Sequence, residues 1–290
     1  SSKRCYYAWR KITMEKFRKI IFTSLLFSIC VGDMQNWKSH SANILPKKRF
    51  EVGLFQPFRY GYSETLEYST YPAWFFVMPN ISLKKSHPDF SGYNTASKWS
   101  LFYPRPILNM VSKKGIGGFI DPTLHVPPLF GFSASLLLTK TISGMDVTFN
   151  SGLDIGLAFG DLDDRVNIEL PLLYHRLSVF HNSYGFHIGF DLEKSITRKL
   201  SMLVDLDFSI LPGMDIKETD SGITKLLGEY SFEHKALLIY EKSETFRLLT
   251  GYKFVFGEYP FGPESRLLPF FPLVDSWIPM IELQWGRSLK

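Results

Sequence analysis

The sequence has very little cysteine and no long uninterrupted run of apolar residues. Its two cysteines, Cys5 and Cys30, both lie near the N-terminus, so the rest of the chain has no disulfide framework, CxxC redox pair or thiolate metal site. After the N-terminal region no segment approaches the roughly 18 consecutive apolar residues of a transmembrane helix. These absences exclude a disulfide-stabilised scaffold and a helical membrane protein.

The N-terminal region has the layout of a secretory signal peptide. A basic stretch begins at Met14, and the apolar run from Ile20 to Gly32 follows it. This run is too short to span a bilayer as a helix, which needs roughly 20 residues. We expect cleavage after Gly32, with the Ala42 region as second choice; lipidation of Cys30 is disfavoured by the bulky Ile29. The expected divisions are an upstream extension (1–13), a signal peptide (14–32), a periplasmic N-terminal segment (33–49) and a folded domain (50–290).

The excess of positive charge belongs to this leader. Residues 1–32 hold 7 of the 33 basic and 1 of the 28 acidic residues, which leaves 26 basic and 27 acidic residues in the remainder. A nearly neutral folded domain gives no indication of a nucleic-acid partner.

The later sequence shows period-two alternation over long stretches. From Tyr184 to Glu193, aromatic and aliphatic residues alternate without exception with Gly, His, Asp and Glu. The segments Asp146–Phe159, Leu200–Ile210 and Phe246–Gly257 repeat the pattern. These runs are about 10 to 14 residues long, whereas strands of soluble proteins usually have about 5 or 6 and membrane-crossing strands about 9 to 11. The length therefore favours strands that cross a bilayer.

A sheet inside a bilayer has to close on itself, because its edge amides would find no water to bond. The predicted fold class is therefore all-β, an antiparallel transmembrane β-barrel with the apolar face toward lipid and the small polar face inside. A soluble exported β-sandwich is the competing fold. Aromatic residues, 16% of the chain, are expected to form girdles at the two membrane interfaces. The candidates are Tyr71, Trp74, Trp99, Tyr103, Tyr184, Tyr252, Tyr259 and Trp277.

Twelve strands are predicted, and ten or fourteen are the alternatives. The assignment contains a conflict, because tight turns at Ser143-Gly144 and Asn182 fall on the side expected to hold long loops. The predicted strands are Phe50–Arg59, Glu64–Thr70, Ala73–Leu83, Lys98–Val111, Leu129–Thr141, Met145–Phe159, Leu172–His181, Ser183–Lys194, Lys199–Leu211, Lys225–Tyr240, Thr245–Gly257 and Ser276–Trp285.

The final segment resembles the terminal strand of bacterial outer-membrane β-barrel proteins. Ile281, Leu283 and Trp285 alternate there, although five residues follow the aromatic one. The resemblance is to the general class and covers residues 50–290. It implies export through the periplasm to the outer membrane, contact with outer-membrane lipid, and barrel-assembly machinery as a partner during biogenesis.

No motif predicts a cofactor or metal site. His181 and Ser183 lie two residues apart at a turn, a pairing that some outer-membrane lipid hydrolases use, but a polar hairpin turn explains it much better. We therefore predict no enzymatic activity from this pair, and a lipid hydrolase is the third functional alternative.

The leading functional prediction is a porin-like channel for small solutes, with mild cation preference. The alternative is a structural or surface-interaction barrel whose loops Ser112–Pro128 and Glu258–Asp275 bind a partner. The residues predicted to line the lumen are Asp146, Thr148, Asn150, Asp154, His187, Asp191, Glu193, Asp205, Asp207, Arg247 and Lys253.

Overall fold

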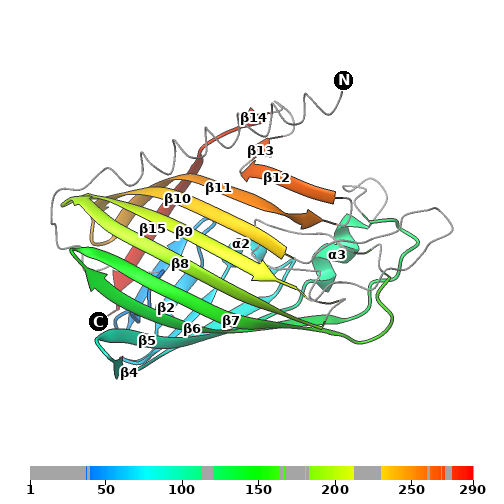
Figure 1. Ribbon diagram of the computed structural model, residues 1–290, viewed down its shortest axis with the longest axis horizontal. Coiled ribbons are helices and arrows are strands. Elements are labelled where there is room, and N and C mark those ends of the chain that lie inside the picture. Colours follow the sequence, from blue (N-terminus) through cyan, green and yellow to red (C-terminus); the bar gives the residue numbers. More distant parts are fainter. Residues whose placement is uncertain are drawn as a thin grey trace.

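The chain forms an antiparallel β-sheet that closes on itself into a barrel (Figure 1). The computed structural model describes residues 37, 40–112, 120–163, 166, 180, 183–211, 230–259, 262–268, 270–271 and 276–289. The strands are β1 (Arg49–Gly53), β2 (Phe58–Gly61), β3 (Leu66–Thr70), β4 (Asn80–Phe90), β5 (Tyr93–Phe102), β6 (Leu129–Ile142), β7 (Met145–Ala158), β8 (Tyr184–Thr197), β9 (Leu200–Ile210), β10 (Tyr230–Ser243), β11 (Phe246–Tyr259), β12 (Gly262–Leu268), β13 (Phe270–Phe271), β14 (Ser276–Trp277) and β15 (Met280–Ser288).

Two short helices lie in the connections of the described chain, α2 (Pro72–Phe75) and α3 (Arg105–Val111). A proline at the first turn suits both, because the first amides of a helix have no intrahelical partner. Neither is long and apolar enough to cross a membrane.

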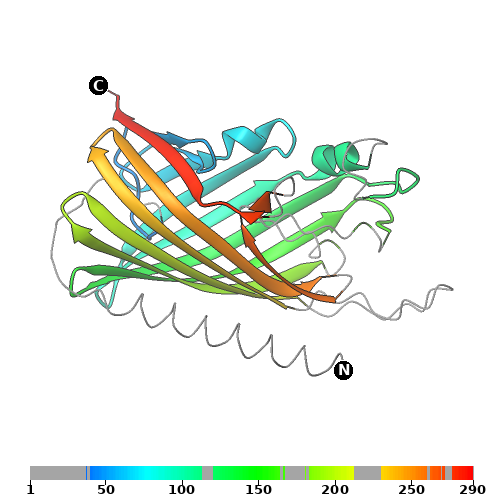
Figure 2. The same cartoon turned by 90° about the horizontal axis from the view of Figure 1, so that it is seen from above.

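The ring is closed by the pairing of β1 with β15 and of β15 with β11. β12 and β15 pair with successive parts of the same edge of β11, Lys253–Tyr259 and Phe246–Gly251. They are thus two pieces of one wall strand, interrupted between Leu268 and Met280, as the dark orange and red ribbons of Figure 2 show. Twelve strand positions follow one another around the wall, which confirms the predicted barrel and its strand number.

Two errors in the predicted strand boundaries compensate in this count. Phe50–Arg59 is two strands, β1 and β2, joined by a short loop. The predicted strand Leu172–His181 has no place in the wall, because β7 pairs directly with β8; most of that range lies outside the described residues. The predicted loop 84–97 is in fact the hairpin of β4 and β5, and part of each predicted strand beside it, Ala73–Leu83 and Lys98–Val111, is helix α2 or α3.

Tight turns and long connections lie at opposite ends of the barrel. Ser91-Gly92 joins β4 to β5 and Ser143-Gly144 joins β6 to β7, and all four residues have the positive φ that two-residue hairpin turns require. β1 begins and β15 ends at this short-turn end, since Arg49 pairs with Ser288. The connections after β5, β7 and β9 depart from the opposite, long-loop end (Figure 1). The conflict at Ser143-Gly144 therefore disappears once the strands are corrected, and Asn182 lies outside the described residues.

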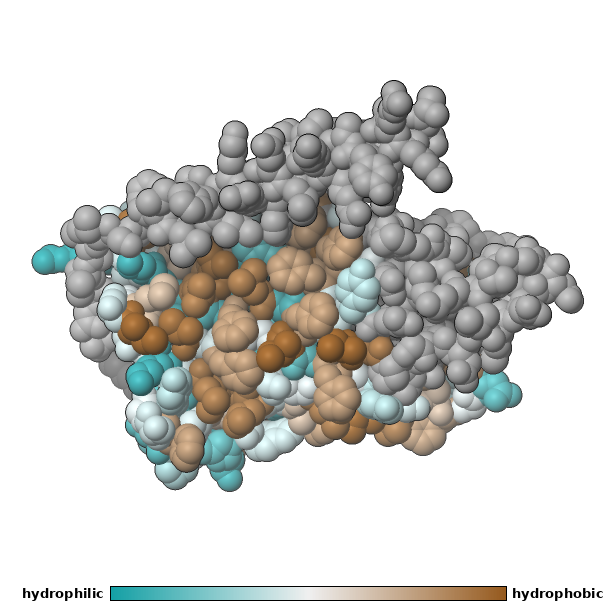
Figure 3. Space-filling model, viewed as in Figure 1, coloured by the Kyte–Doolittle hydropathy of each residue, from teal (hydrophilic) through white to brown (hydrophobic). Residues whose placement is uncertain are grey.

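The outer surface of the wall is apolar. Phe186, Ile188 and Phe190 of β8 and Leu238 and Tyr240 of β10 are exposed, and apolar side chains gather over this face of the barrel (Figure 3). Alternate residues of the same strands point inward, as the period-two pattern predicts. A closed sheet with an apolar exterior is the architecture of an outer-membrane β-barrel.

The N-terminal segment lies inside the barrel at its short-turn end. The amide of Ala42 donates to Thr139 Oγ1 at 2.7 Å, Lys84 Nζ donates to the carbonyl of Asn43 at 2.8 Å, and Arg247 donates to the carbonyl of Trp37 at 3.0 Å. Trp37, Ala42 and Asn43, which fall in the predicted periplasmic segment 33–49, therefore lie inside the barrel.

Both ends of the lumen are filled. Below the segment, Leu203, Leu237, Ile239 and Leu249 form a buried cluster at the short-turn end. At the long-loop end a second buried cluster packs beneath α3 and the strand ends, so that a cavity remains between the two. This cluster comprises Met78, Phe102, Ile107, Leu108, Ile120, Val126, Leu129, Val166, Phe180 and Leu211.

We predict that the purified protein stays monodisperse only in detergent and that the unheated sample migrates faster on gels than the heated one. The closed ladder resists opening, while the apolar exterior requires a lipid-like solvent. Gel mobility before and after boiling, with size-exclusion chromatography in plain buffer, measures both properties. A monodisperse species in plain buffer would contradict the membrane-facing exterior.

Candidate functional site

A cavity of about 610 Å³ occupies the middle of the barrel. Its wall is made by inward residues of β2–β11, by His40 and Ser41 of the N-terminal segment and by the loop between β1 and β2. Tyr71 and Trp74, which we expected in the interfacial girdle, line this cavity instead. The charged side chains around it are Arg59, Glu67, Lys84, Lys98, Asp154, Asp191, Asp205, Asp207, Glu233, Lys235 and Lys253.

A buried ion-pair network covers one side of the interior. Arg59 donates to Glu67 twice, at 2.7 Å each, and to Glu51 Oε2 at 2.9 Å. Arg49 adds a contact to Glu51 at 3.2 Å, and Lys84 Nζ lies 3.6 Å from Glu67. Because these charges are shielded from water, each depends on its partners for solvation.

The opposite interior surface carries two further ion pairs. Lys235 Nζ lies 2.5 Å from Asp205 Oδ2, and Lys253 Nζ lies 2.6 Å from Glu233 Oε2. Five basic and six acidic side chains line the cavity, so its charges nearly balance. The predicted cation preference rested on a list dominated by acidic residues, and it stays a prediction.

The eleven residues predicted to line the lumen fall into two groups. Thr148 is buried against Thr139, and Arg247 is buried against Trp37. Asp146 accepts from Thr141 at the start of β7, and Glu193 is partly buried on β8. The other seven line the cavity: Asn150, Asp154, His187, Asp191, Asp205, Asp207 and Lys253.

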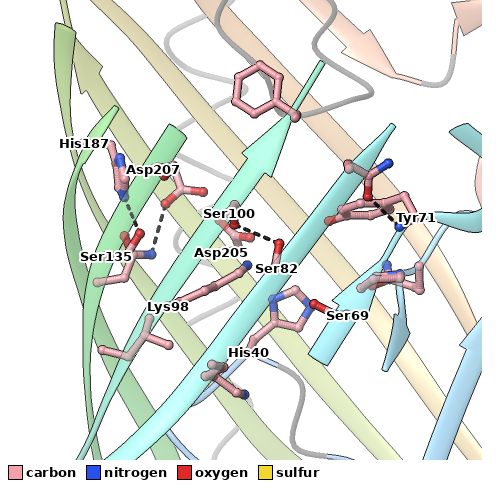
Figure 4. Close-up of a pocket in the computed structure, with 18 of the residues that line it drawn as sticks. His40, Ser69, Tyr71, Ser82, Lys98, Ser100, Ser135, His187, Asp205 and Asp207 are labelled. Atoms are coloured by element: carbon pink, nitrogen blue, oxygen red, sulfur yellow. Dashed lines mark hydrogen bonds between the residues drawn. The ribbon is translucent and has the colours of Figure 1, made fainter. Parts of the chain in front are cut away.

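A serine, a histidine and an aspartate form a connected set on the cavity wall. Ser135 Oγ lies 3.0 Å from His187 Nε2, and His187 Nδ1 lies 2.9 Å from Asp154 Oδ2. All three point inward from neighbouring strands, β6, β8 and β7 respectively, and Figure 4 shows Ser135 and His187 facing one another. The two ring nitrogens thus have separate partners, as in the Ser-His-Asp arrangement of hydrolases.

The strand register explains how these residues meet. Ser135 pairs with Gly152 of β7, and Gly152 pairs with His187 of β8. Since Gly152 has no side chain, the imidazole reaches across β7 to the serine; a Cβ at this position would lie 2.5 Å from the His187 ring. Gly152 therefore leaves room for the contact between Ser135 and His187.

Lys98 of β5 is the cross-strand neighbour of Ser135 on the other side. Its side chain extends into the same space (Figure 4), and it forms no hydrogen bond or ion pair with another described residue. A cation in the same cavity as a serine hydroxyl can stabilise negative charge that develops there.

The histidine and serine that the sequence singled out form no comparable site. His181 lies outside the described residues. Ser183 is exposed just before β8, in a backbone conformation with φ 69°. Sequence reasoning placed His187 and Asp154 in the lumen but missed Ser135, because a small residue in an alternating strand carries no signal until the register is known.

One group of ligand-type side chains occurs among the described residues, formed by His40, Asp191 and Asp205. Their ligating atoms lie within 4.8 Å of one another. Lys235 already pairs with Asp205, so a cation there would have to displace an ammonium group. The set therefore gives no support for a metal site.

No protein-family model matches the chain, and no curated protein is similar to it in sequence. Solved structures with related folds include the outer membrane channel DcaP of Acinetobacter baumannii, with 9% identity over 90% of this chain and 68% of that one, at a TM-score of 0.36. LpxR from Salmonella typhimurium has 9% identity over 84% and 90%, at 0.38, and Pseudomonas aeruginosa OprD has 13% over 86% and 63%, at 0.33. These likenesses are too distant to support an argument; the assignment to the general class of outer-membrane barrels rests on this chain's own closed sheet and apolar exterior.

We predict that Arg59→Met lowers the free energy of unfolding by about 3–5 kcal/mol, because it leaves Glu51 and Glu67 buried without their cation. Urea titration of the protein in lipid vesicles measures the loss. Arg287→Met, which removes an exposed arginine from β15, is the control and should leave stability nearly unchanged. Equal midpoints for the two variants would contradict a structural role for the network.

Proposed function

We propose that the barrel is a hydrolase of carboxylic esters, with Ser135 as nucleophile, His187 as general base and Asp154 as the group that orients the imidazole. The observation that carries the proposal is the set of contacts at 3.0 Å and 2.9 Å to the two different nitrogens of His187. When Nδ1 donates its proton to Asp154, Nε2 is left as the acceptor for the serine hydroxyl.

The reaction follows from this arrangement. Ser135 Oγ bonds to the carbonyl carbon while its proton passes to His187 Nε2, and the carbonyl oxygen becomes an oxyanion next to Lys98. Collapse of this intermediate breaks the ester bond, and His187 returns the proton to the departing alcohol. A water molecule then attacks the acyl-serine with His187 again accepting a proton, which releases the acid and restores the enzyme.

The three side chains remain accessible to a substrate. His187 and Asp154 keep 17% and 25% of their side-chain surface exposed, whereas the structural ion pair of Arg59 and Glu67 keeps 5% and 4%. If His187 and Asp154 served only to fill the barrel, we would expect their side chains to be as buried as those of Arg59 and Glu67. This difference favours a reactive role over a purely structural one.

The packing of the interior also provides evidence about the two other predicted functions, a channel and a partner-binding barrel. A passive channel needs a continuous aqueous path, whereas described residues fill the lumen at the short-turn end and an apolar cluster fills the long-loop end. In the loop predicted to bind a partner, Ile120 and Val126 are buried in that cluster. Both observations favour a closed reaction chamber, and channel activity stays a prediction that planar-bilayer recording can test.

We predict that Ser135→Ala lowers kcat/KM for a short-chain p-nitrophenyl ester by at least about a thousandfold, because it removes the nucleophile. Labelling by a fluorophosphonate should disappear in the same variant. Ser133→Ala is the matched control, since Ser133 lies two residues away on the same face of β6 and lines the same cavity. Undiminished hydrolysis or labelling in Ser135→Ala would rule out this nucleophile.

We predict that Lys98→Met lowers kcat by about a hundredfold to a thousandfold and leaves KM nearly unchanged, since the ammonium group acts on charge present only in the transition state. Steady-state kinetics with the same ester separates the two constants. Lys85→Met, at an exposed position of the neighbouring strand, is the control. A change confined to KM would show that Lys98 binds substrate and does not stabilise the oxyanion.

A further inference from the structure

The strands on one side of the barrel are too short to span its full height. β1, β2 and β3 have 5, 4 and 5 residues, whereas β6, β7 and β8 have 14 each. Since β1 starts at the short-turn end, these short strands leave the long-loop half of the wall without sheet on their side. A strand that crosses the bilayer fully needs about 9 to 11 residues.

The neighbouring strand position is interrupted at the same height. β12 pairs with β11 along one edge, and no described strand pairs with its other edge. The wall strand resumes only at Met280, where β15 begins. The β13–β14 hairpin lies in the chain between β12 and β15 and forms a separate two-stranded sheet. The β1–β2 loop (54–57) and helix α2, together with Leu268 and Met280, are called the seam below.

Specific hydrogen bonds hold the loop of the seam in place. Glu282 of β15 accepts hydrogen bonds from the amides of Phe55 at 2.8 Å and of Gln56 at 3.4 Å, and its own side chain is fully buried. A Cβ at Gly53 would lie 2.0 Å from the Glu282 carboxylate, so the glycine gives it room. A side chain thus supplies the partners that an adjacent strand would supply elsewhere in the wall, which lets the loop lie at membrane depth.

The residues of the seam are mostly apolar, with Gln56 as the polar exception among those that line the cavity. Phe55, Pro57, Trp74, Leu268 and Met280 line the cavity from within. On the outer surface, Leu54 is 55% exposed, Phe55 53% and Phe76, directly after α2, 89%. The path between the membrane side and the cavity is therefore bordered by aromatic and aliphatic groups.

The seam lies opposite the Ser-His-Asp set. Around the ring of twelve positions, β6, β7 and β8 face β15, β1 and β2 across the lumen. A chain that entered at the seam would point across the cavity toward Ser135. Both the seam and the reactive residues lie in the long-loop half of the barrel.

We infer that the seam admits the acyl chain of a membrane lipid sideways into the cavity, so that the substrate is a lipid carboxylic ester from the leaflet at the long-loop end. This inference rests on the proposed function for the reaction and on the seam for the route. Described residues pack at both ends of the lumen, which disfavours entry along the barrel axis. A route through the seam passes mostly apolar side chains and faces the acyl chains of the membrane. A polar solute would gain nothing from such an entrance.

The route is tested without hydrolysis by photo-crosslinking in Ser135→Ala. The probe is a glycerophospholipid with a diazirine at the end of one acyl chain, incorporated into vesicles with the variant and mapped by mass spectrometry. Labels on inward residues of the cavity, such as Leu137 or Leu268, are expected. Labels confined to outward residues, such as Phe190 or Leu238, would overturn lateral entry.

A variant in which the seam can be blocked chemically provides a second test of lateral entry. In a chain with Cys5 and Cys30 replaced by serine, Phe55→Cys is alkylated with a bulky maleimide, and Phe159→Cys, which is exposed on the opposite wall, is the matched control. Alkylation at the seam should remove most of the cavity labelling, and alkylation of the control should not. Cavity labelling that survives the block would overturn the route.

The two proposals fail separately. If the lipid enters but Ser135 is not a nucleophile, cavity labelling and its loss on blocking persist while the Ser135-containing protein hydrolyses no ester. If the hydrolase proposal is right and the route is wrong, the short-chain ester is cleaved in a Ser135-dependent manner while the lipid probe labels only the exterior.

Discussion

The structure depends on one constraint, that a backbone amide at membrane depth has to find its hydrogen-bond partner within the protein. The constraint forces the sheet to close. At membrane depth, polar side chains then lie in the interior of the twelve-strand ring. Where β1 to β3 are too short to continue the ladder, a buried carboxylate on β15 takes over and bonds the loop amides. Closure and the lateral seam are two responses to the same requirement.

A closed sheet also fixes which inward residues meet. The pairing of Ser135 with Gly152 and of Gly152 with His187 places a hydroxyl and an imidazole on either side of an empty position. Rigid strands hold such a set more accurately than loops, and the absence of a side chain at one residue brings the other two into contact. The same register puts a lysine on the far side of the serine.

The sequence predicts the exterior better than the interior. Outward residues of β7 to β11 face one uniform solvent, so their alternation is regular and the strands could be placed within a few residues. Along β1 to β5 the strands are short, or they are polar on both faces near the short-turn end, as at Lys84 and Lys85, and the period-two signal is lost. The buried network of Arg59, Glu51 and Glu67 and the contact between Ser135 and His187 depend on pairing between strands, which no single-strand pattern contains.

The location of the N-terminal segment gives the barrel support from within. Trp37 and the residues from His40 to Leu45 contact inward groups of β3, β4, β6 and β11, and the chain passes from them directly into β1. Once β1 has joined β15, the ring surrounds this segment on all sides. The segment therefore connects inward groups of four strands that lie far apart in the sequence, and it braces the ring from within.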